Sequence, residues 1–362
     1  MKSQVYLNGR FFSQAITGVQ RFATEITASI DKLVDQGTWP ESIVLTPRSS
    51  AVSLSRSSFR RLHLAQVGRM RGHFWEQAEL PVASRSGVLV NLGNTAPVLS
   101  GSRQVVVIHD AGVFDTPESY SLRFRTWYKV LQRRLVDAGA HVVTVSKFAR
   151  SRISECLAVD PEAIPVMYEG GDHMLRAAAD MDVLHRNGLI PGRFILIVGA
   201  RAAHKNVEAI RELMPLLERR GLVVAVVGAI DPSAVFHRGS RANQIGRAVG
   251  RVSDAELRAL YEAATCLLFP SRYEGFGLPP VEAMACGCPV LASGSGAVRE
   301  ICGDAALYFS ADEPSSLQDA VSRLLDDETM AADLRARGAA RSAAFRWDAS
   351  ARALAAVVQT LQ

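Results

Sequence analysis

Two glutamates in a glycine-rich stretch are the residues of this sequence best suited to chemistry. Glu274 and Glu282 stand at the ends of the stretch, and Gly275 and Gly277 lie between them. The stretch follows the apolar run 266–269, which predicts a buried strand, and it leads into a segment whose two prolines are typical of a first helical turn. Glycines at such a junction let backbone N–H groups approach a ligand, and the helix dipole favours negative charge there. Carboxylates beside an anion site accept hydrogen bonds from hydroxyls, so the stretch predicts a ligand that is part phosphate and part sugar or ribose.

A lysine and a histidine lie at two other places where an expected strand ends. Lys205 follows the apolar run 194–198 at a strand-to-helix junction, where its charge can neutralise a diphosphate. His109 ends the apolar run 105–108, and a histidine at the carboxyl end of a parallel strand can hydrogen-bond a hydroxyl or share a proton. A histidine that only satisfies a structural hydrogen bond is the alternative for His109.

Two adjoining segments resemble a known family. Glu-Gly-Phe-Gly-Leu-Pro at 274–279 and Glu-Ala-Met-Ala-Cys-Gly-Cys-Pro-Val at 282–290 resemble the signature of the retaining nucleotide-sugar glycosyltransferases of family 4, the group 1 glycosyl transferases, which have the two-domain GT-B fold. The motif is far longer than a lone glycine fingerprint and more specific. Two glutamates that are merely solvated at a helix end are the alternative. The resemblance implies that Lys205 binds the donor diphosphate, Glu282 the ribose and Glu274 the transferred sugar.

Two further donor-binding positions come from the resemblance. Many family members carry an arginine six residues before the lysine, where this chain has Gly199, so we expect Arg201 to substitute from a shifted position. Gly18 matches a family glycine loop near the donor, although one glycine can equally mark a plain strand-to-helix turn. The resemblance thus implies His109, Lys205 and Glu274 as catalytic residues, and Gly18, Arg201, Lys205, Gly275, Phe276, Gly277, Leu278 and Glu282 as donor-binding residues.

The order of the expected elements indicates the fold. Short apolar strands alternate with amphipathic helices, which favours doubly wound parallel sheets, and 362 residues exceed what one such core usually holds. With the resemblance, we expect an α/β protein of the GT-B fold, in which two Rossmann-like doubly wound domains face a central cleft. The expected parts are an N-terminal acceptor-binding domain at 1–172, a linker at 173–190, a C-terminal nucleotide-sugar-binding domain at 191–345, and a helix at 346–362 that crosses back to the first domain.

Composition and net charge indicate in which compartment the protein works and which partners it can bind. The net charge of +5 suits nucleotides, anionic lipids or nucleic acid, but no nucleic-acid motif accompanies it, so we expect no nucleic-acid partner. We expect a cytoplasmic protein, because the N-terminus shows no signal peptide and no apolar run is long enough to span a bilayer. The five cysteines predict reduced, buried thiols rather than a zinc site. They are Cys156, Cys266, Cys286, Cys288 and Cys302.

Two stretches of the N-terminal half mix basic and aromatic residues. The segment 121–136 predicts a helix that either rests on an anionic membrane surface, where it meets a lipid-linked acceptor, or turns a basic face to water. The segment 69–77 contains a Trp-Glu-Gln element found in part of the family. Peripheral contact with the inner face of the membrane therefore stays open.

The resemblance implies the reaction. We expect a retaining, metal-independent hexosyltransferase without cofactors, which moves a sugar from a nucleoside diphosphate sugar to a saccharide or lipid-linked saccharide acceptor. The Asp180 to Asp182 pair looks like a metal-binding Asp-x-Asp, but we interpret it as chance, since it lies in the expected linker. Mannose from GDP-mannose, in the biosynthesis of surface polysaccharide such as lipopolysaccharide, is the expected case. UDP- or dTDP-sugars, a sugar-nucleotide epimerase and a catalytically silent binding subunit stay open.

Overall fold

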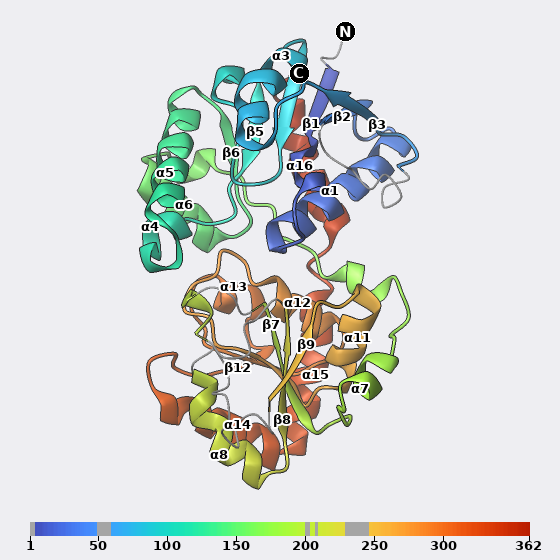
Figure 1. Cartoon of the computed structure of the whole chain (residues 1–362), viewed down its shortest axis with the longest axis vertical. Helices are drawn as coiled ribbons and strands as arrows, with labels where there is room; N and C mark the ends of the chain where they lie inside the picture. Colours follow the sequence, from blue (N-terminus) through green and yellow to red (C-terminus); the bar gives the residue numbers. More distant parts are fainter. Residues whose placement is uncertain (1–3, 49–58, 200–202, 207–208, 229–245) are drawn as a thin grey trace. The chain divides into compact units, whose positions relative to one another are not determined.

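The computed structural model describes residues 4–48, 59–199, 203–206, 209–228 and 246–362 (Figure 1). They form two compact units, of which the first comprises Met1–Glu169 with Arg346–Gln362 and the second comprises Gly170–Phe345. The chain leaves the first unit at Gly170 and returns to it at Arg346. The two crossing segments bond to each other, because the amide of Gly171 donates to the carbonyl of Phe345 at 3.2 Å.

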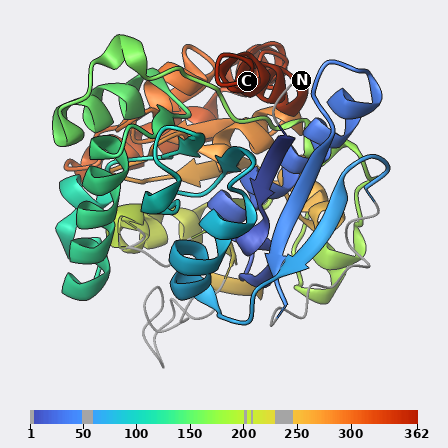
Figure 2. The same ribbon diagram turned by 90° about the horizontal axis from the view of Figure 1, so that it is seen from above.

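The first unit is built on a six-stranded sheet in the order β3-β2-β1-β4-β5-β6. Every neighbouring pair is parallel, so all strands end at the same edge. Helices cover both faces of this sheet (Figures 1 and 2). The strands are β1 (Gln4–Asn8), β2 (Ser42–Pro47), β3 (His63–Val67), β4 (Gly87–Asn91), β5 (Gln104–Val107) and β6 (His141–Val143).

Apolar faces at helical spacing attach the helices of the first unit. Phe22, Ile26 and Ile30 of α1 (Gly18–Asp35) are fully buried, as their spacing predicts. Trp347 of α16 (Trp347–Gln359) is also fully buried and meets the ring of Phe22 edge-on at 5.9 Å. The last helix is therefore part of the first unit's core. The other helices named below are α2 (Gly72–Phe74), α3 (Leu80–Ala83), α4 (Gly112–Asp115), α5 (Leu122–Asp137) and α6 (Lys147–Leu157), with the π-helical turn η3 (Trp75–Glu79) between α2 and α3.

The second unit repeats this plan in the order β12-β11-β10-β7-β8-β9, again with parallel pairs throughout. Its core gathers buried aliphatic side chains of β7, β8, β10 and the flanking helices. The strands are β7 (Phe194–Val198), β8 (Val223–Val227), β9 (Gly246–Gly250), β10 (Cys266–Phe269), β11 (Val290–Ala292) and β12 (Ala306–Tyr308), and the main helices are α8 (Ile210–Arg219), α11 (Asp254–Ala263), α12 (Leu278–Ala285), α13 (Val298–Cys302), α14 (Pro314–Asp326) and α15 (Glu328–Ser342).

The expected linker at 173–190 is structured. It contains the 3-10 turn η7 (Asp172–Leu175) and the helix α7 (Asp182–Arg186), and both belong to the second unit. Its polar composition hides four buried apolar residues, which anchor it: Met174, Val183, Leu184 and Leu189. The amide of Asp182 donates to Asp180 Oδ1 at 3.1 Å, so this acidic pair shapes the turn that opens α7.

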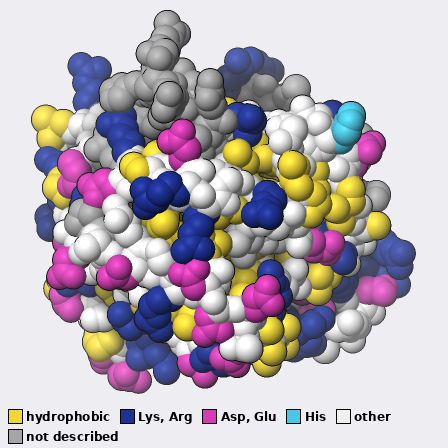
Figure 3. Space-filling model, turned by 90° about the horizontal axis from the view of Figure 1, so that it is seen from below, with side chains coloured by type: hydrophobic (Ala, Val, Ile, Leu, Met, Phe, Trp, Pro, Cys, Tyr) yellow, Lys and Arg dark blue, Asp and Glu magenta, His cyan; other side chains and the backbone are white. Residues whose placement is uncertain are grey.

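Charges of both signs are mixed on the face of the protein shown in Figure 3. On the described part of the face shown in Figure 3, basic and acidic side chains alternate among apolar ones. The small net charge of +5 therefore produces no single-sign field over that face.

Candidate functional site

The loop after β10 and the start of α12 hold the first glutamate. Gly277 is the N-cap residue of α12 and has φ 102°, a left-handed conformation that favours glycine. Leu278 is the first helical residue, and two prolines follow it in the first turn. The carbonyl of Glu274 accepts a hydrogen bond from the amide of Ala297 at 3.0 Å. A glycine-bearing loop thus meets a helix N-terminus here, as the sequence predicts.

Gly296 limits how Glu274 is held. Its φ is +62°, and a Cβ atom at this position would lie 2.6 Å from the carbonyl oxygen of Glu274 and 2.8 Å from its nitrogen. We expect Gly296→Ala to lower the free energy of unfolding by about 1–3 kcal/mol and to weaken nucleotide binding, because the loop must move. Thermal unfolding and calorimetric titration measure both. Gly188→Ala is the control, since Gly188 has φ +59° but no atom within 4 Å; equal nucleotide binding by the two variants would contradict the expectation.

Lys205 and Glu274 form an ion pair. Lys205 ends the 3-10 turn η8 (Ala203–Lys205) after β7, and its Nζ atom lies 2.5 Å from Glu274 Oε1. The two side chains are 22% and 12% exposed. The amide of Arg272 donates to the carbonyl of His204 at 2.7 Å, which ties the two loops together. The fold therefore brings together a lysine and a carboxylate that are far apart in the sequence.

Glu282 points into a buried polar cluster of the second unit. Its Oε1 atom lies 3.1 Å from Nε2 of His173, and its Oε2 atom accepts from the Tyr261 hydroxyl at 2.9 Å. All three residues are buried. Burial, followed by the charge of Glu282 and the hydrogen bond to it, raises the pKa of Tyr261 well above 10, so the phenol remains the donor. No pattern in the sequence indicated His173, which lies in the expected linker, and Tyr261 looks like an ordinary helix core residue.

His109 is enclosed within the first unit. It is 5% exposed, its Nδ1 atom lies 3.2 Å from Glu169 Oε1, and its Nε2 atom lies 3.1 Å from the carbonyl of Leu92. The ring of Phe22 contacts it edge-on at 4.5 Å. A carbonyl only accepts, so Nε2 carries a proton and Nδ1 faces the carboxylate. A sugar hydroxyl reaches either ring nitrogen only by displacing one of these partners, and the catalytic role of His109 stays a prediction.

Gly18 and Arg201 are the two other positions that are predicted to bind the donor. Gly18 is the first residue of α1, and a Cβ atom there would meet no atom within 4 Å, so crowding does not require glycine at this position. Arg201 lies outside the described residues.

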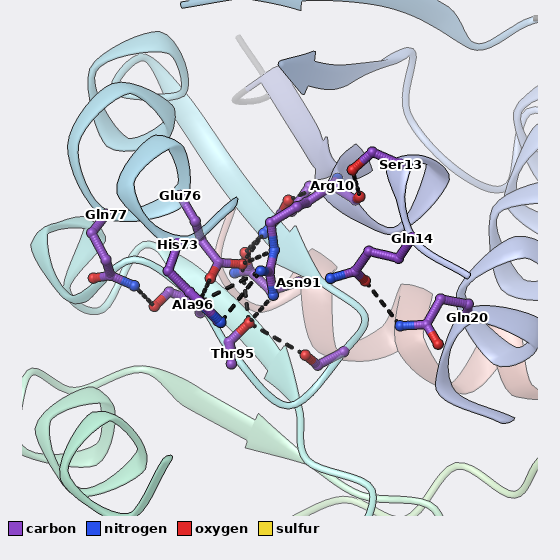
Figure 4. A network of polar contacts seen from close by, with 12 residues as sticks. Arg10, Ser13, Gln14, Gln20, His73, Glu76, Gln77, Asn91, Thr95 and Ala96 are labelled. Atoms are coloured by element: carbon purple, nitrogen blue, oxygen red, sulfur yellow. Dashed lines mark hydrogen bonds and ion pairs between the residues drawn. The ribbon is translucent and has the colours of Figure 1, made fainter. Parts of the chain in front are cut away.

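A second polar cluster lies at the carboxyl edge of the first sheet (Figure 4). Glu76 of η3 is 1% exposed, and its Oε1 atom lies 3.2 Å from Arg10 Nε and accepts from Asn8 and Thr95. Its Oε2 atom lies 3.2 Å from His73 Nδ1. Burial alone would raise the pKa of Glu76, but the hydrogen bond from His73 and the charge of Arg10 outweigh it, and the pKa is lowered from 4.5. Glu76 is the glutamate of the Trp-Glu-Gln element, and the sequence indicated none of its partners.

Glu76→Gln should destabilise the first unit. Removing one partner of a buried ion pair costs about 3–5 kcal/mol, because Arg10 keeps a buried charge. The folded-state pKa of Glu76 is lowered, so its stabilising contribution is present above 4.5 and is lost as the pH falls through the folded-state value. We expect the variant to unfold more easily at neutral pH and to lose less stability on acidification. The test is urea unfolding across a pH series, followed by tryptophan fluorescence, since all four tryptophans belong to the first unit; parallel pH curves would contradict this role.

None of the helices formed by the described residues combines the length and the apolar character needed to cross a membrane.

The amino-acid sequence of this chain is similar to sequences of known proteins. Residues 185–341 match the profile of a family described as glycosyl transferases group 1. O-antigen chain mannosyltransferase B of Escherichia coli is 30% identical over 258 residues, which are 68% of this chain and 67% of that protein. O-antigen chain mannosyltransferase RfbU of Salmonella typhimurium is 28% identical over 272 residues, which are 72% of this chain and 73% of that protein.

Solved structures share the fold over the full length. Sucrose-phosphate synthase from Thermosynechococcus elongatus has a TM-score of 0.76 at 18% identity, and the match covers 100% of this chain and 99% of that one. HepE from Anabaena in complex with UDP and glucose has a TM-score of 0.72 at 16% identity, again over 100% and 99% of the two chains. Together with the two parallel sheets, these likenesses confirm the predicted α/β fold class.

Proposed function

Because this chain belongs to the family of glycosyl transferases group 1, as its glutamate stretch predicts, we propose that it moves mannose from GDP-mannose to a saccharide acceptor with retention of configuration. The enzyme class, a glycosyltransferase, follows from the family. Mannose is the proposed sugar because the relatives named above are mannosyltransferases. Those relatives act on O-antigen chains by name, which favours a surface polysaccharide, lipopolysaccharide included, as the product.

The observation that carries the proposal is the Lys205–Glu274 pair beside the N-terminus of α12. A donor diphosphate offers Lys205 a second anionic partner, which leaves the Glu274 carboxylate to accept hydrogen bonds from sugar hydroxyls. The backbone amides of residues 276–278 lie at a helix N-terminus, where partial positive charge favours an anion. Glu282 would accept from the ribose hydroxyls in a direction fixed by Tyr261 and His173.

These groups suggest how the reaction proceeds. The bond between the anomeric carbon and the diphosphate oxygen breaks, the acceptor oxygen bonds to the same face of that carbon, and the acceptor proton passes to the departing phosphate. Lys205 and the helix N-terminus stabilise the charge that develops on the diphosphate. The proposal requires no metal and no cofactor, since these fixed groups oppose the charge of the leaving group. Glu274 positions the sugar and does not attack it.

The acceptor is proposed to bind the first unit, and a lipid-linked acceptor would bring the enzyme to the inner face of the cytoplasmic membrane. Support comes from α5, where Leu122, Val130 and Arg133 share one side of the helix by their spacing and are exposed. Such a mixture of apolar and basic side chains suits an anionic lipid surface.

Calorimetric titration with GDP, UDP and dTDP in EDTA tests the donor assignment. We expect GDP to bind most tightly without a metal, and GDP-mannose to be consumed only when a saccharide acceptor is present. Tighter binding of UDP or dTDP would replace the proposed donor. If no nucleotide binds, a silent binding subunit becomes the better interpretation.

A further inference from the structure

A group of rings lies beside the buried polar cluster of Glu76. The rings of His73 and Trp127 lie 5.6 Å apart and meet edge-on, and those of His73 and Tyr128 lie 6.3 Å apart at 86°. Phe124 stacks on Tyr128 at 4.1 Å. Phe124, Trp127 and the His73 side chain are 41%, 40% and 37% exposed. We call His73, Phe124, Trp127 and Tyr128 the ring surface.

Hydrogen-bonding atoms accompany these rings. Among the residues that the structure describes, neither the Trp127 indole N–H nor the Tyr128 hydroxyl has a hydrogen-bond partner. The Nε2 atom of His73 has only a long contact, 3.5 Å from Arg10. Burial raises the pKa of Tyr128 and outweighs the opposing charge of Arg10, so the hydroxyl stays a donor at neutral pH. The ring surface thus presents donors and an acceptor next to apolar ring faces.

The buried cluster holds the ring surface in a fixed orientation. Glu76 bonds to Nδ1 of His73, which leaves Nε2 as the ring nitrogen that can bond to a ligand. Arg10 bridges Glu76 and Thr95, with its NH2 atom 2.8 Å from Thr95 Oγ1. Arg10, Thr95 and Asp110 lie in the loops that follow β1, β4 and β5, so the ring surface lies at the carboxyl edge of a doubly wound sheet. Ligands bind at this edge in such folds.

We propose that His73, Trp127 and Tyr128 form a saccharide subsite on the first unit, which holds the acceptor for the proposed transfer. A pyranose has an apolar face of C–H groups and a rim of hydroxyls. Exposed rings pack against the face, while the Tyr128 hydroxyl, the Trp127 N–H and His73 Nε2 bond to the rim. The subsite rests on the proposed function for its role as acceptor site, but its saccharide binding can be measured alone.

A lipid surface is the competing occupant, and the geometry disfavours it at this place. Three hydrogen-bonding atoms held among rings on a rigid polar frame select a ligand of defined shape, such as a pyranose, whereas lipid head groups have no fixed arrangement. The exposed side of α5 that carries Leu122 and Arg133 is separate from Trp127 and Tyr128 by the helical repeat. Variants on the two sides of α5 therefore distinguish a saccharide from a membrane.

The test uses the full chain and α-mannobiose, cellobiose and lactose as probes. Trp39, Trp75 and Trp347 are buried and Trp127 is 40% exposed, so acrylamide quenching of tryptophan fluorescence reports on the ring surface. We expect at least one disaccharide to protect Trp127 from quenching. Tyr128→Phe, which keeps the ring, should weaken that disaccharide by about threefold to tenfold, and His73→Ala by more. Leu122→Ala is the matched control on the same helix and should bind like the parent.

Further outcomes decide the assignment. The inference is wrong if no disaccharide protects Trp127, if Tyr128→Phe and His73→Ala, checked by thermal unfolding, bind like the parent, or if only phosphatidylglycerol vesicles give protection. GDP affinity, measured on the same proteins, should be unchanged in every variant, because Lys205, Glu274 and Glu282, which are proposed to bind the donor, belong to the second unit. Saccharide binding without nucleotide binding would refute the proposed donor site and leave the saccharide subsite standing, whereas the reverse result would refute the subsite alone.

Discussion

Lys205→Ala is expected to lower kcat/KM for sugar transfer by about 100- to 1000-fold, the largest effect that we predict for a single residue. Lys205 is the cation that the fold places 2.5 Å from Glu274, beside the N-terminus of α12. It would stabilise the diphosphate more strongly as that group departs, because negative charge grows on it. The loss should therefore appear in kcat as well as in KM.

Nucleotide binding separates this role from a structural one. If Lys205 neutralises the diphosphate, Lys205→Ala lowers the affinity for GDP. The affinity for guanosine, which has no phosphate, is unchanged. Arg220→Ala is the matched control, because it removes a positive charge after α8, at the opposite end of that helix from Lys205, where Arg220 pairs with exposed Asp326. A variant that loses guanosine and GDP equally would contradict the assignment.

Glu274 and Lys205 should not act independently. The two side chains are in direct contact, so the effects of Lys205→Ala and Glu274→Gln on kcat/KM are expected to add to more than the loss in the double variant. The double variant lacks both charges, whereas each single variant leaves one charge without its partner. Strictly additive losses in a double-mutant cycle would mean that the contact has no part in transfer.

The sequence alone predicts those elements whose defining residues are neighbours in the chain. The loop and helix from Glu274 to Glu282 are continuous in the chain, so glycine, proline and carboxylate spacing could be interpreted directly. Most strands were predictable for the same reason, since they are short apolar runs that are buried in the sheet, whereas β3 and β9 are partly exposed. The fold class and the family followed from these local patterns.

The rest depends on contacts between distant residues. Glu282 takes its partners from η7 and α11, and Glu76 takes Arg10 and Thr95 from the ends of two strands, which only the folded sheet brings together. The polar stretch at 173–190 looked like a linker, because composition does not reveal that Val183, Leu184 and Leu189 find a buried surface. His109 was correctly placed at a strand end, but its pairing with Glu169 could not be seen in the sequence.

Glu282→Gln is expected to weaken GDP by about tenfold to a hundredfold, the range for hydrogen bonds to a charged group, while 2′,3′-dideoxy-GDP binds as it does to the parent. The carboxylate would bond to the ribose hydroxyls, and the dideoxy nucleotide lacks them. Tyr261→Phe removes only the hydroxyl that orients Oε2, so it should lower the affinity for GDP less, by about threefold to tenfold. The affinity for the dideoxy nucleotide should again be unchanged.

In this interpretation, Tyr261 and His173 orient the Glu282 carboxylate. If they only stabilised the fold, their variants would change the nucleotide affinities in a different pattern. Loss of packing would lower affinity for both nucleotides and would move with thermal stability, whereas loss of orientation is confined to the nucleotide that has hydroxyls. Glu262→Gln, a neighbour of Tyr261 on α11 whose carboxylate pairs with Arg258 at the surface, is the control and should change neither affinity. If Tyr261→Phe weakens both nucleotides alike, the buried cluster stabilises the second unit and does not direct Glu282 toward ribose.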